Sequence, residues 1–366
     1  MLQEEISAIT KLLDEPDAAM DREVDPDAAQ QKAREGHLET MREMGVYVPV
    51  KLAEAESKPI TIKWVDRPEK SPPSARLTAR GYEQPGTYGK DFYAGTPATG
   101  TLRLLVALAI RKQWVIGIGD AERAFLQAPL PEGDPPLYVW PPAEAKEESD
   151  TVWQLLKAMP GLKVSAKTWG SHASDKLYAE HGLKQSKLDE CVYYGAGVVM
   201  MRHMDDFVVV GEHAKVKEIL AALQETLLVS GAEILEHIGQ KVQILGRVLT
   251  KTRKGYTISC SLRLLDEIIK AEGLETASGT RLPGEKVKET PGDKEELDAA
   301  EHGHYRTQVG RLLWLSVDRA DLQHSVMRLS RSVGAPTRRD AKALKRLVRY
   351  LIFTRRWVQH LVGSGL

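Results

Sequence analysis

The chain has 366 residues, of which 42% are hydrophobic and 28% charged, as in an ordinary globular protein with two or three lobes. No run approaches the roughly 20 apolar residues that a membrane span needs, and the acidic N-terminus is neither a secretory signal nor a transit peptide. Two cysteines, Cys191 and Cys260, cannot form a disulfide framework, and their separation resembles no zinc-ligand spacing. We therefore expect a protein without a membrane partner or secretion signal, in a reducing compartment such as the cytosol or nucleus.

Charge is unevenly distributed along the chain, although the formal net charge is zero. Residues 1–58 contain 14 acidic and 7 basic residues, whereas residues 301–366 contain 13 basic and 4 acidic residues. A basic C-terminal surface is suited to phosphate groups, but a solvated helix face has the same composition. Charge alone leaves nucleic-acid binding open.

The N-terminal part is expected to contain acidic helical segments followed by a β-hairpin. Residues 1–58 are rich in Ala, Glu and Asp. The β-branched and aromatic residues of 59–65 predict a strand. Three prolines in 66–73 indicate a turn, after which 75–80 can return as the partner strand.

The central part predicts a helix and then a buried strand that ends at an aspartate. Apolar residues recur at helical spacing in 101–111, and the short apolar run 114–119 leads directly to Asp120. A helix or loop is expected over 121–126, before a proline-rich stretch. Residues 166–181 have the pattern of an amphipathic helix.

An acidic pair, Asp205 and Asp206, lies between two apolar, valine-containing strands at 197–202 and 207–210. Aspartates are common in exposed hairpin turns, so the pair can be an ordinary turn. Desolvating an unpaired carboxylate costs several kcal/mol, and a bound divalent cation relieves that cost. Both interpretations remain open from the pair alone.

The rest of the sequence predicts further strands and then a mainly helical end. The expected elements are a helix over 215–228, strands over 242–248 and 256–260, a helix over 262–272, a polar linker over 277–298 and a basic helical tail over 305–361. Hairpins interleaved with helices favour an α+β fold over a doubly wound parallel sheet.

Asp120 places a third carboxylate at the end of a second apolar strand. If the strands carrying Asp120 and Asp205 are neighbours in one sheet, the carboxylates can hold two divalent cations. Two cations roughly 3.5 to 4 Å apart align a hydroxyl nucleophile with a triphosphate and stabilise the leaving group. Oxygen ligands suit two Mg²⁺ ions, with Mn²⁺ as a substitute.

Five blocks resemble, in the family's order, the reverse transcriptase of copia-type long-terminal-repeat retrotransposons. The blocks are KWV with SARLTARGYEQ (63–84), TLRLLVALAI with GDAERAFLQAPL (101–130), LLKAMPGLKVSAKTW (155–169), HMDDFVVVG (203–211) and YRTQVGRLLWLSVDRADLQHSVMRLSR (305–331). Five blocks in order are far more specific than an acidic pair. The resemblance implies a right-hand polymerase fold, with fingers, a palm whose antiparallel sheet carries the Asp-Asp hairpin, and a thumb.

The same resemblance implies how the chain is divided. The expected segments are an acidic N-terminal segment (1–32), fingers and palm (33–250), a thumb-like region (251–285), a polar linker (286–303) and a basic helical connection region (304–366) without a ribonuclease H domain. We therefore expect a polyprotein fragment, a decayed copy, or a gene model cut from either.

The resemblance implies that Asp120, Asp205 and Asp206 are the catalytic, metal-binding triad, and that the carbonyl of Ala121 can also reach a metal. The implied activity is RNA-directed DNA polymerisation from deoxynucleoside triphosphates on a primed RNA or DNA template, in a cytoplasmic virus-like particle or the nucleus. The alternatives are a catalytically inactive remnant that only binds nucleic acid and a host protein that uses the fold as a scaffold.

Several residues are implied to contact the incoming nucleotide. They are Arg76, Arg80, Phe125, Gly161 and Lys163, with Arg67, Lys70 and His203 as further candidates. Phe125 would be the aromatic steric gate against a ribose 2′-hydroxyl, and the guanidinium groups would contact the triphosphate. The alternative for Phe125 is plain core packing, and for the arginines it is solvation.

Some residues depart from the family's pattern near the expected site. His203 replaces the Tyr before the acidic pair and retains a side chain that can hydrogen-bond. Pro160, Val164 and Ala166 replace Tyr, Gln and Pro in the nucleotide-pocket block. Glu122 adds a carboxylate close to the expected metals. These departures favour the inactive remnant, whereas the three intact aspartates favour the enzyme.

Overall fold

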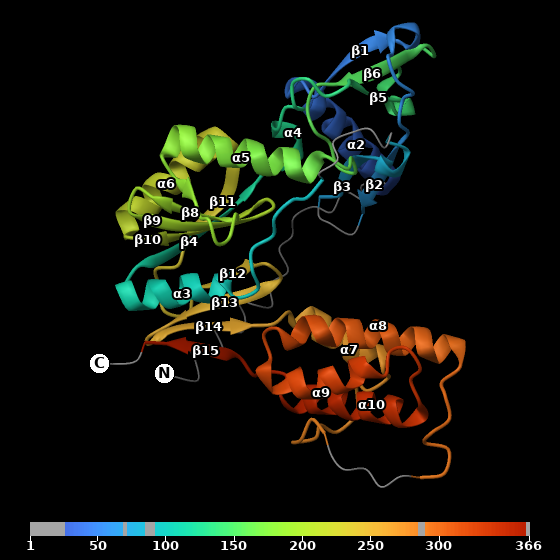
Figure 1. Cartoon of the computed structure of the whole chain (residues 1–366), viewed down its shortest axis with the longest axis vertical. Helices are drawn as coiled ribbons and strands as arrows, with labels where there is room; N and C mark the ends of the chain where they lie inside the picture. Colours follow the sequence, from blue (N-terminus) through green and yellow to red (C-terminus); the bar gives the residue numbers. More distant parts are fainter. Residues whose placement is uncertain (1–25, 69–71, 85–91, 285–289, 364–366) are drawn as a thin grey trace, which may run out of the picture. The chain divides into compact units, whose positions relative to one another are not determined.

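The computed structural model describes residues 26–68, 72–84, 92–284 and 290–363, which form helices and antiparallel sheets (Figure 1). The chain divides into two compact units. Unit 1 consists of Met1–Ala94 and Phe125–His172, and unit 2 consists of Gly95–Ala124 and Ala173–Leu366. Both units combine helices with sheets, which confirms the expected α+β class.

A β-hairpin and a long helix form the first part of unit 1. β2 (Ile62–Arg67) pairs with β3 (Ser74–Ala79), which confirms the expected hairpin. α2 (Pro26–Glu43) packs against β3, and its Arg34 forms an ion pair with Asp66 of β2. This helix lies within the segment expected to be helical, of which residues 1–25 are outside the described residues.

Three short strands form a second sheet in unit 1. They are, in spatial order, β1 (Tyr47–Lys51), β6 (Thr151–Leu155) and β5 (Leu137–Val139). β1 corrects the sequence analysis, which expected only helices and loops up to residue 58. The strand forms because it pairs with β6, and the Tyr47 ring stacks on Trp153 with 3.7 Å between ring centroids. A partner so distant in sequence leaves no local signal.

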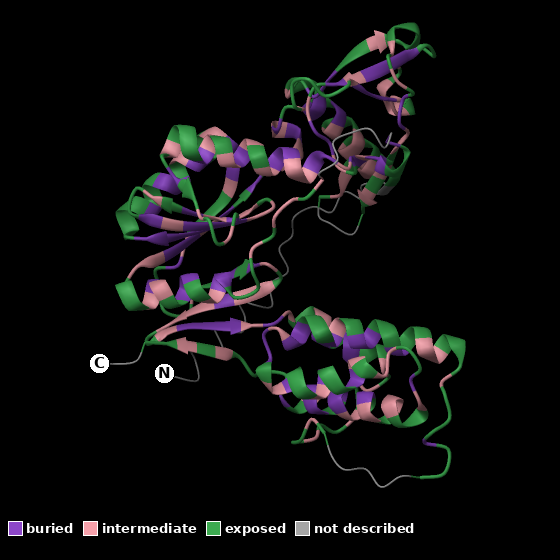
Figure 2. Ribbon diagram, viewed as in Figure 1, coloured by how far each residue is buried: buried purple, intermediate pink, exposed green. Residues whose placement is uncertain are grey.

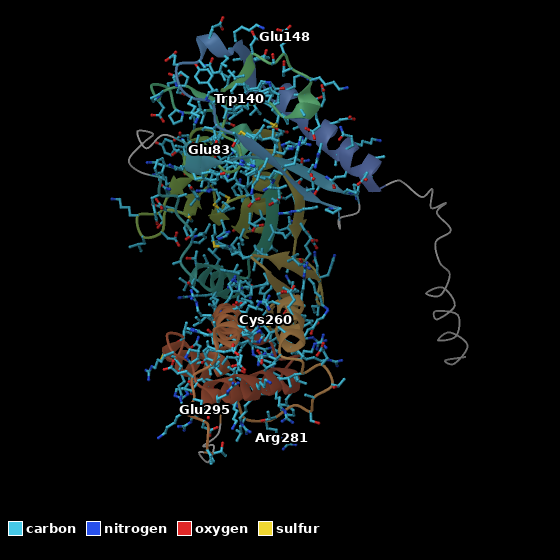
Figure 3. All side chains as sticks on the ribbon, turned by 90° about the vertical axis from the view of Figure 1, so that its right-hand side faces the viewer. Glu83, Trp140, Glu148, Cys260, Arg281 and Glu295 are labelled. Carbon is cyan, nitrogen blue, oxygen red and sulfur yellow. The ribbon has the colours of Figure 1, made fainter. Side chains whose placement is uncertain are left out.

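Short helical turns connect these elements. They are η1 (Leu52–Glu54), η2 (Gly81–Glu83), α4 (Ala124–Gln127) and η3 (Ala143–Ala145). Glu83 accepts hydrogen bonds from the Thr61 N–H at 2.8 Å and the Thr61 hydroxyl at 2.7 Å (Figure 3). These bonds tie the end of η2 to the start of the hairpin.

Unit 2 contains a six-stranded antiparallel sheet. Its strands, in spatial order, are β11 (Val229–Ile234), β4 (Val115–Ala121), β10 (Asp206–Gly211), β9 (Val198–His203), β8 (Val192–Gly195) and β7 (Lys184–Gln185). The expected strands before Asp120 and on both sides of the acidic pair are confirmed. β4 continues through Asp120, so this aspartate lies within the strand.

Helices cover both faces of this sheet (Figure 1). α3 (Thr101–Lys112) lies on one face and α6 (His213–Leu227) on the other, and both confirm expected helices. A Cβ on Gly117 of β4 would lie 2.6 Å from a methyl group of Val216, so glycine allows α6 to approach the sheet. α5 (Ser165–His181) confirms the helix expected over 166–181.

A second sheet of unit 2 follows. Its strands, in spatial order, are β12 (Lys241–Ile244), β13 (Arg247–Thr252), β14 (Gly255–Ser259) and β15 (Gln359–Val362). The single strand expected over 242–248 is wrong, because Leu245 and Gly246 both have positive φ and reverse the chain as a two-residue hairpin turn. β15 is also a correction, since the expected helical tail ends in a strand that pairs with β14.

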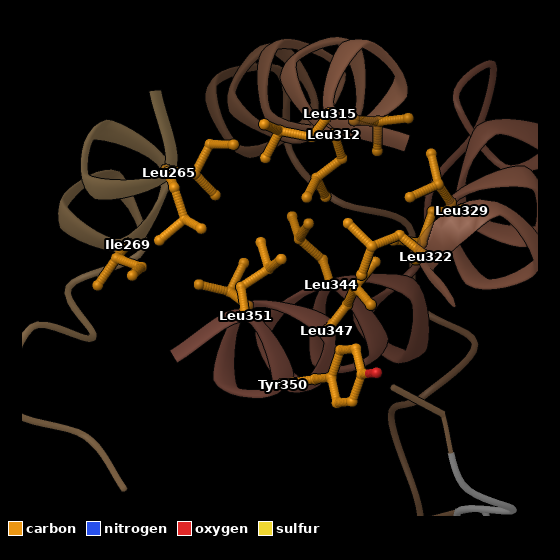
Figure 4. Packing of buried hydrophobic residues seen from close by; sticks show 14 of the residues in the cluster. Leu265, Ile269, Leu312, Leu315, Leu322, Leu329, Leu344, Leu347, Tyr350 and Leu351 are labelled. Atoms are coloured by element: carbon orange, nitrogen blue, oxygen red, sulfur yellow. The ribbon is translucent and has the colours of Figure 1, made fainter. Parts of the chain in front are cut away.

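Four helices form a bundle at the C-terminal end of unit 2, around a core of leucine and isoleucine side chains (Figure 4). They are α7 (Leu262–Ala271), α8 (Ala299–Ser316), α9 (Ala320–Arg331) and α10 (Arg338–Phe353). Helices expected in two separate regions, 251–285 and 304–366, therefore share one core. The expected linker over 286–303 is helical from Ala299, because Asp298 and Glu301 form a capping box.

The distribution of buried residues agrees with this arrangement of helices and sheets (Figure 2). Buried residues lie in the strands and on the helix faces that pack together, and Cys260 is buried within the bundle core. No helix in the described part of the chain is long and apolar enough to cross a membrane.

Candidate active site

Asp120, Asp206 and His203 form a row across three adjacent strands of unit 2. Asp206 is the register partner of Asp120 on β4 and of His203 on β9. Side chains directly opposite each other on antiparallel strands have Cβ atoms about 4.5 to 5.5 Å apart. The neighbouring strands that the carboxylate site requires are therefore present.

The row lies on the face of the sheet that α3 covers. Alternate residues of a strand share a face, and Ile116 of β4 and Val208 and Val210 of β10 pack with α3 in one core. Asp120 and Asp206 belong to the same alternating sets. The sheet therefore presents both carboxylates on one side, at the end where the apolar core stops.

Asp205 lies in the two-residue turn that joins β9 to β10. Met204 precedes it with a φ of 57°, a left-handed conformation that is uncommon for a residue other than glycine. The Ala121 N–H donates a hydrogen bond to the Asp205 carbonyl at 2.8 Å, and Arg202 donates to the Met204 carbonyl at 3.4 Å. These bonds hold the turn against the end of β4.

The carboxylates destabilise one another electrostatically. Burial and repulsion from Asp205 and Asp120 raise the pKa of Asp206 to about 6. The pKa of Asp120 is also raised, by partial burial and by repulsion from Asp205 and Glu122. None of the three aspartates has an ion-pair partner among the residues that the structure describes. A cation would relieve this repulsion.

The aspartates form an open site and not a closed cage. Within the described ranges, no group of three His, Cys, Asp or Glu side chains converges closely enough to enclose a metal ion. Mg²⁺ retains waters and binds substrate phosphates, so it needs only one or two protein carboxylates at a polymerase site. The donor set, three carboxylates at the ends of neighbouring strands without a counter-charge among the described residues, fits such an ion. Ala121 is buried beside them, and its role as a carbonyl ligand stays a prediction.

A pocket of about 370 Å³ adjoins the row. His203 and Asp206 line it from the sheet, and Leu102 and Arg103 line it from α3. The turn between β12 and β13 and the end of α8 complete its wall. Asp206 is therefore accessible from a cavity within unit 2.

The residues expected at the nucleotide belong to unit 1, apart from His203. Arg76 and Arg80 are exposed at β3, and Arg67 is exposed at the end of β2. Phe125 is half-buried in α4. Lys70 lies outside the described residues.

Gly161 is packed tightly against the end of β3. The Ala79 N–H donates a hydrogen bond to the Pro160 carbonyl at 2.8 Å, which joins the 155–169 block to the hairpin. A Cβ on Gly161 would lie 2.1 Å from the Ala79 carbonyl oxygen, and Gly161 has a φ of +92°. Only glycine fits this backbone contact.

Lys163 is held by a residue that the sequence analysis did not single out. Its ammonium group donates to the Gln84 backbone carbonyl at 2.9 Å, and its N–H donates to Gln84 Oε1 at 2.9 Å. Gln84 is 2% exposed, and its Nε2 has no hydrogen-bond partner among the residues that the structure describes. Gln84 is the last residue of the SARLTARGYEQ block, so the resemblance of that block to the family could have identified it.

Comparisons with known proteins agree on one family. The family model described as reverse transcriptase (RNA-dependent DNA polymerase) matches residues 45–286. The chain is 28% identical over 299 residues to the retrovirus-related Pol polyprotein from transposon RE2 of Arabidopsis thaliana, covering 76% of this chain and 19% of that protein. It is 25% identical over 341 residues to the corresponding polyprotein from transposon TNT 1-94 of Nicotiana tabacum, covering 87% and 25%.

The chain therefore spans about a fifth to a quarter of the length of these relatives. Among solved structures, foamy viral protease-reverse transcriptase in complex with RNA/DNA hybrid aligns with 88% of this chain and 37% of its own. The TM-score is 0.49 and the sequence identity is 13%.

Proposed function

Since the chain belongs to the reverse transcriptase (RNA-dependent DNA polymerase) family, we propose that it polymerises DNA within a copia-type retrotransposon Pol polyprotein. The reaction would join a primer 3′-hydroxyl to the α-phosphate of a deoxynucleoside triphosphate and release pyrophosphate. The template would be RNA or DNA. The observation that carries this proposal is the register that places Asp206 opposite Asp120, next to Asp205 in the turn.

Asp120, Asp205 and Asp206 would hold two Mg²⁺ ions, with Mn²⁺ as a substitute. Bound divalent ions would supply charge neutralisation for the attacking and leaving oxygens. The contribution of the protein would be to place carboxylate oxygens together at the ends of neighbouring strands. The hydrogen bond from the Ala121 N–H to the Asp205 carbonyl supports this, because it fixes the turn relative to β4.

Residues of unit 1 would bind the nucleotide. Arg76 and Arg80 are exposed, so their guanidinium groups are available for triphosphate oxygens. Phe125 would discriminate against a 2′-hydroxyl. Gly161 has no side chain and would therefore let the backbone at this position approach the substrate. Lys163 would have to leave the Gln84 carbonyl before it could bind a phosphate.

The basic C-terminal helices would bind the nucleic-acid backbone. Arg328 and Arg331 of α9 are exposed, as are Arg339 and Lys342 of α10. Contacts of this type make affinity strongly dependent on salt. Binding would follow the shape and phosphates of the duplex more than the base sequence.

Primer extension tests the proposal. The wild-type chain and Asp205→Asn/Asp206→Asn are compared on poly(rA)/oligo(dT) with Mg²⁺ or Mn²⁺, and Asp175→Asn serves as a control because Asp175 is exposed on α5. We expect extension by the wild type and the control and none by the double variant. Equal extension by all three proteins would reject the proposal that this chain is the polymerase. Duplex binding by the wild type without extension would also reject it, and the chain would then be a remnant that only binds nucleic acid.

A further inference from the structure

Two arginines converge on one buried carboxylate beside the pocket at Asp206. Asp318 follows α8, and its side chain is 1% exposed. Arg103 of α3 donates to Asp318 Oδ1 at 2.8 Å. Arg247 of β13 donates through Nε to both carboxylate oxygens of Asp318 at 2.8 Å. We call these three residues the Asp318 cluster.

The cluster also joins the elements around the pocket. Arg103 donates to the Val317 carbonyl and, at 3.0 Å, to Gln359 Oε1 of β15. Arg247 donates to the Leu245 carbonyl at 3.1 Å in the β12–β13 turn. Its guanidinium group lies over the Trp314 ring, 5.5 Å from the centroid. Asp318 is the one carboxylate among the contacts that position both guanidinium groups.

The charges of the cluster do not balance within it. Two guanidinium groups share one carboxylate. All three side chains line the 370 Å³ pocket that Asp206 and His203 also line. The carboxylate of Asp206 has no counter-charge among the described residues, so a released guanidinium group would find an acceptor there.

We propose that Asp318 is a positioning residue that keeps Arg103 and Arg247 away from Asp206. A guanidinium group on Asp206 would neutralise the carboxylate and compete with a divalent cation for its oxygens. Asp318 prevents this competition by binding both arginines itself. The inference rests on the proposed function in one respect, because it takes Asp206 to hold a divalent cation.

The test measures Mn²⁺ binding without nucleotide or nucleic acid, from the electron paramagnetic resonance signal of free Mn²⁺. The full chain is compared with Asp318→Asn, which removes the charge but keeps the size of the side chain. Asp266→Asn is the matched control, since Asp266 forms an exposed ion pair with Arg355 in the same bundle. We expect Asp318→Asn to weaken Mn²⁺ binding by about tenfold, a common size for coupling between charged sites. The control should leave the Kd unchanged.

A rescue variant separates competition from simple loss of structure. Asp318→Asn/Arg247→Gln removes one of the two competing guanidinium groups together with the carboxylate that binds it, so Mn²⁺ binding should return toward the wild-type Kd. Asp318→Glu retains the charge and should bind as the wild type does. An unchanged Kd in Asp318→Asn overturns the proposal, and so does a double variant that binds as weakly as Asp318→Asn.

Asp318→Asn can fail to fold, because removing one partner of a buried ion pair is strongly destabilising. In that case Mn²⁺ binding is measured in Arg247→Gln alone, since this variant leaves Asp318 paired with Arg103. Mn²⁺ binding should be equal or tighter in this variant, and weaker binding would overturn the proposal.

Failure of the proposed function is recognised separately. A chain that binds Mn²⁺ through Asp206 but extends no primer is not a polymerase, yet the Asp318 variants still report on competition. Loss of Mn²⁺ binding in Asp206→Asn establishes which site is measured. If Asp206→Asn leaves Mn²⁺ binding unchanged, Asp206 holds no cation and the Asp318 proposal is rejected.

Discussion

Asp206 lies directly opposite Asp120 on neighbouring antiparallel strands. No basic side chain among the described residues forms an ion pair with either carboxylate. This arrangement is electrostatically unfavourable, since both pKa values are raised. Proteins keep such groups together at functional sites more often than elsewhere.

Divalent cations should stabilise the folded chain through these aspartates. A ligand that binds only the folded state at about ten times its Kd adds about 1.4 kcal/mol to the free energy of unfolding. Mg²⁺ should therefore raise the melting temperature by a few degrees in calorimetry, and Asp206→Asn should lose most of this increase. An equal increase in the variant would place the stabilising ion elsewhere.

The stability of the metal-free chain should depend on pH through Asp206. The ordinary pKa of an aspartate is 3.8, whereas the pKa of Asp206 is about 6 in the folded chain, so the folded state takes up a proton between these values that the unfolded state does not. The contribution is fully present below the lower pKa and is lost as pH rises through about 6. Each pKa unit corresponds to about 1.4 kcal/mol, and partial exposure reduces the effect to about 1 to 2 kcal/mol.

Denaturant unfolding at pH 7.5 and pH 5 would measure this effect. Asp206→Asn should be more stable than the wild type at pH 7.5, and the difference should shrink at pH 5. Taking the difference between the two proteins cancels the titrating groups that do not interact with Asp206. A difference that stays constant with pH would contradict the raised pKa of Asp206.

Periodicity and turn signals predicted the elements that carry the aspartates. Both strands around the acidic pair are apolar runs of strand length, so the sequence indicated that Asp205 and Asp206 lie between two strands. Which strand neighbours β10 is decided by tertiary pairing. The register of Asp120 with Asp206 therefore required the structure, although the family resemblance implied their proximity.

Other features were missed for identifiable reasons. The turn at Leu245 and Gly246 interrupts an apolar run with a leucine at a φ of 49°, a conformation that leucine rarely adopts. Strands β1 and β15 form against partners far away in the sequence. The Asp318 cluster gathers side chains from α3, β13 and the end of α8, and no local pattern connects them.

Gly161→Ala should destabilise unit 1 by about 2 kcal/mol or more, because a Cβ would meet the Ala79 backbone carbonyl at 2.1 Å in addition to the positive φ. Gly133→Ala is the matched control. Gly133 has a nearly identical φ of +91° in the same unit, with nothing within 4 Å of its Cβ position. We expect a cost of about 1 kcal/mol there. Equal losses in thermal unfolding would show that the contact with Ala79 is unimportant.

Phe125→Val should increase ribonucleotide incorporation if Phe125 is the steric gate. The smaller side chain would leave room for a 2′-hydroxyl, so the ratio of kcat/KM for a ribonucleotide to that for the matching deoxynucleotide should rise. Phe125→Tyr retains the ring and should keep the wild-type ratio. Steady-state primer extension with each nucleotide alone measures this ratio.

Thermal unfolding of the same two variants tests the packing alternative. Phe125 is half-buried, so truncation costs some stability in either case. A gate changes nucleotide selectivity in a protein that remains folded and active, whereas a packing residue changes only the melting temperature. An active Phe125→Val protein with unchanged selectivity and a lower melting temperature would therefore assign Phe125 to the core.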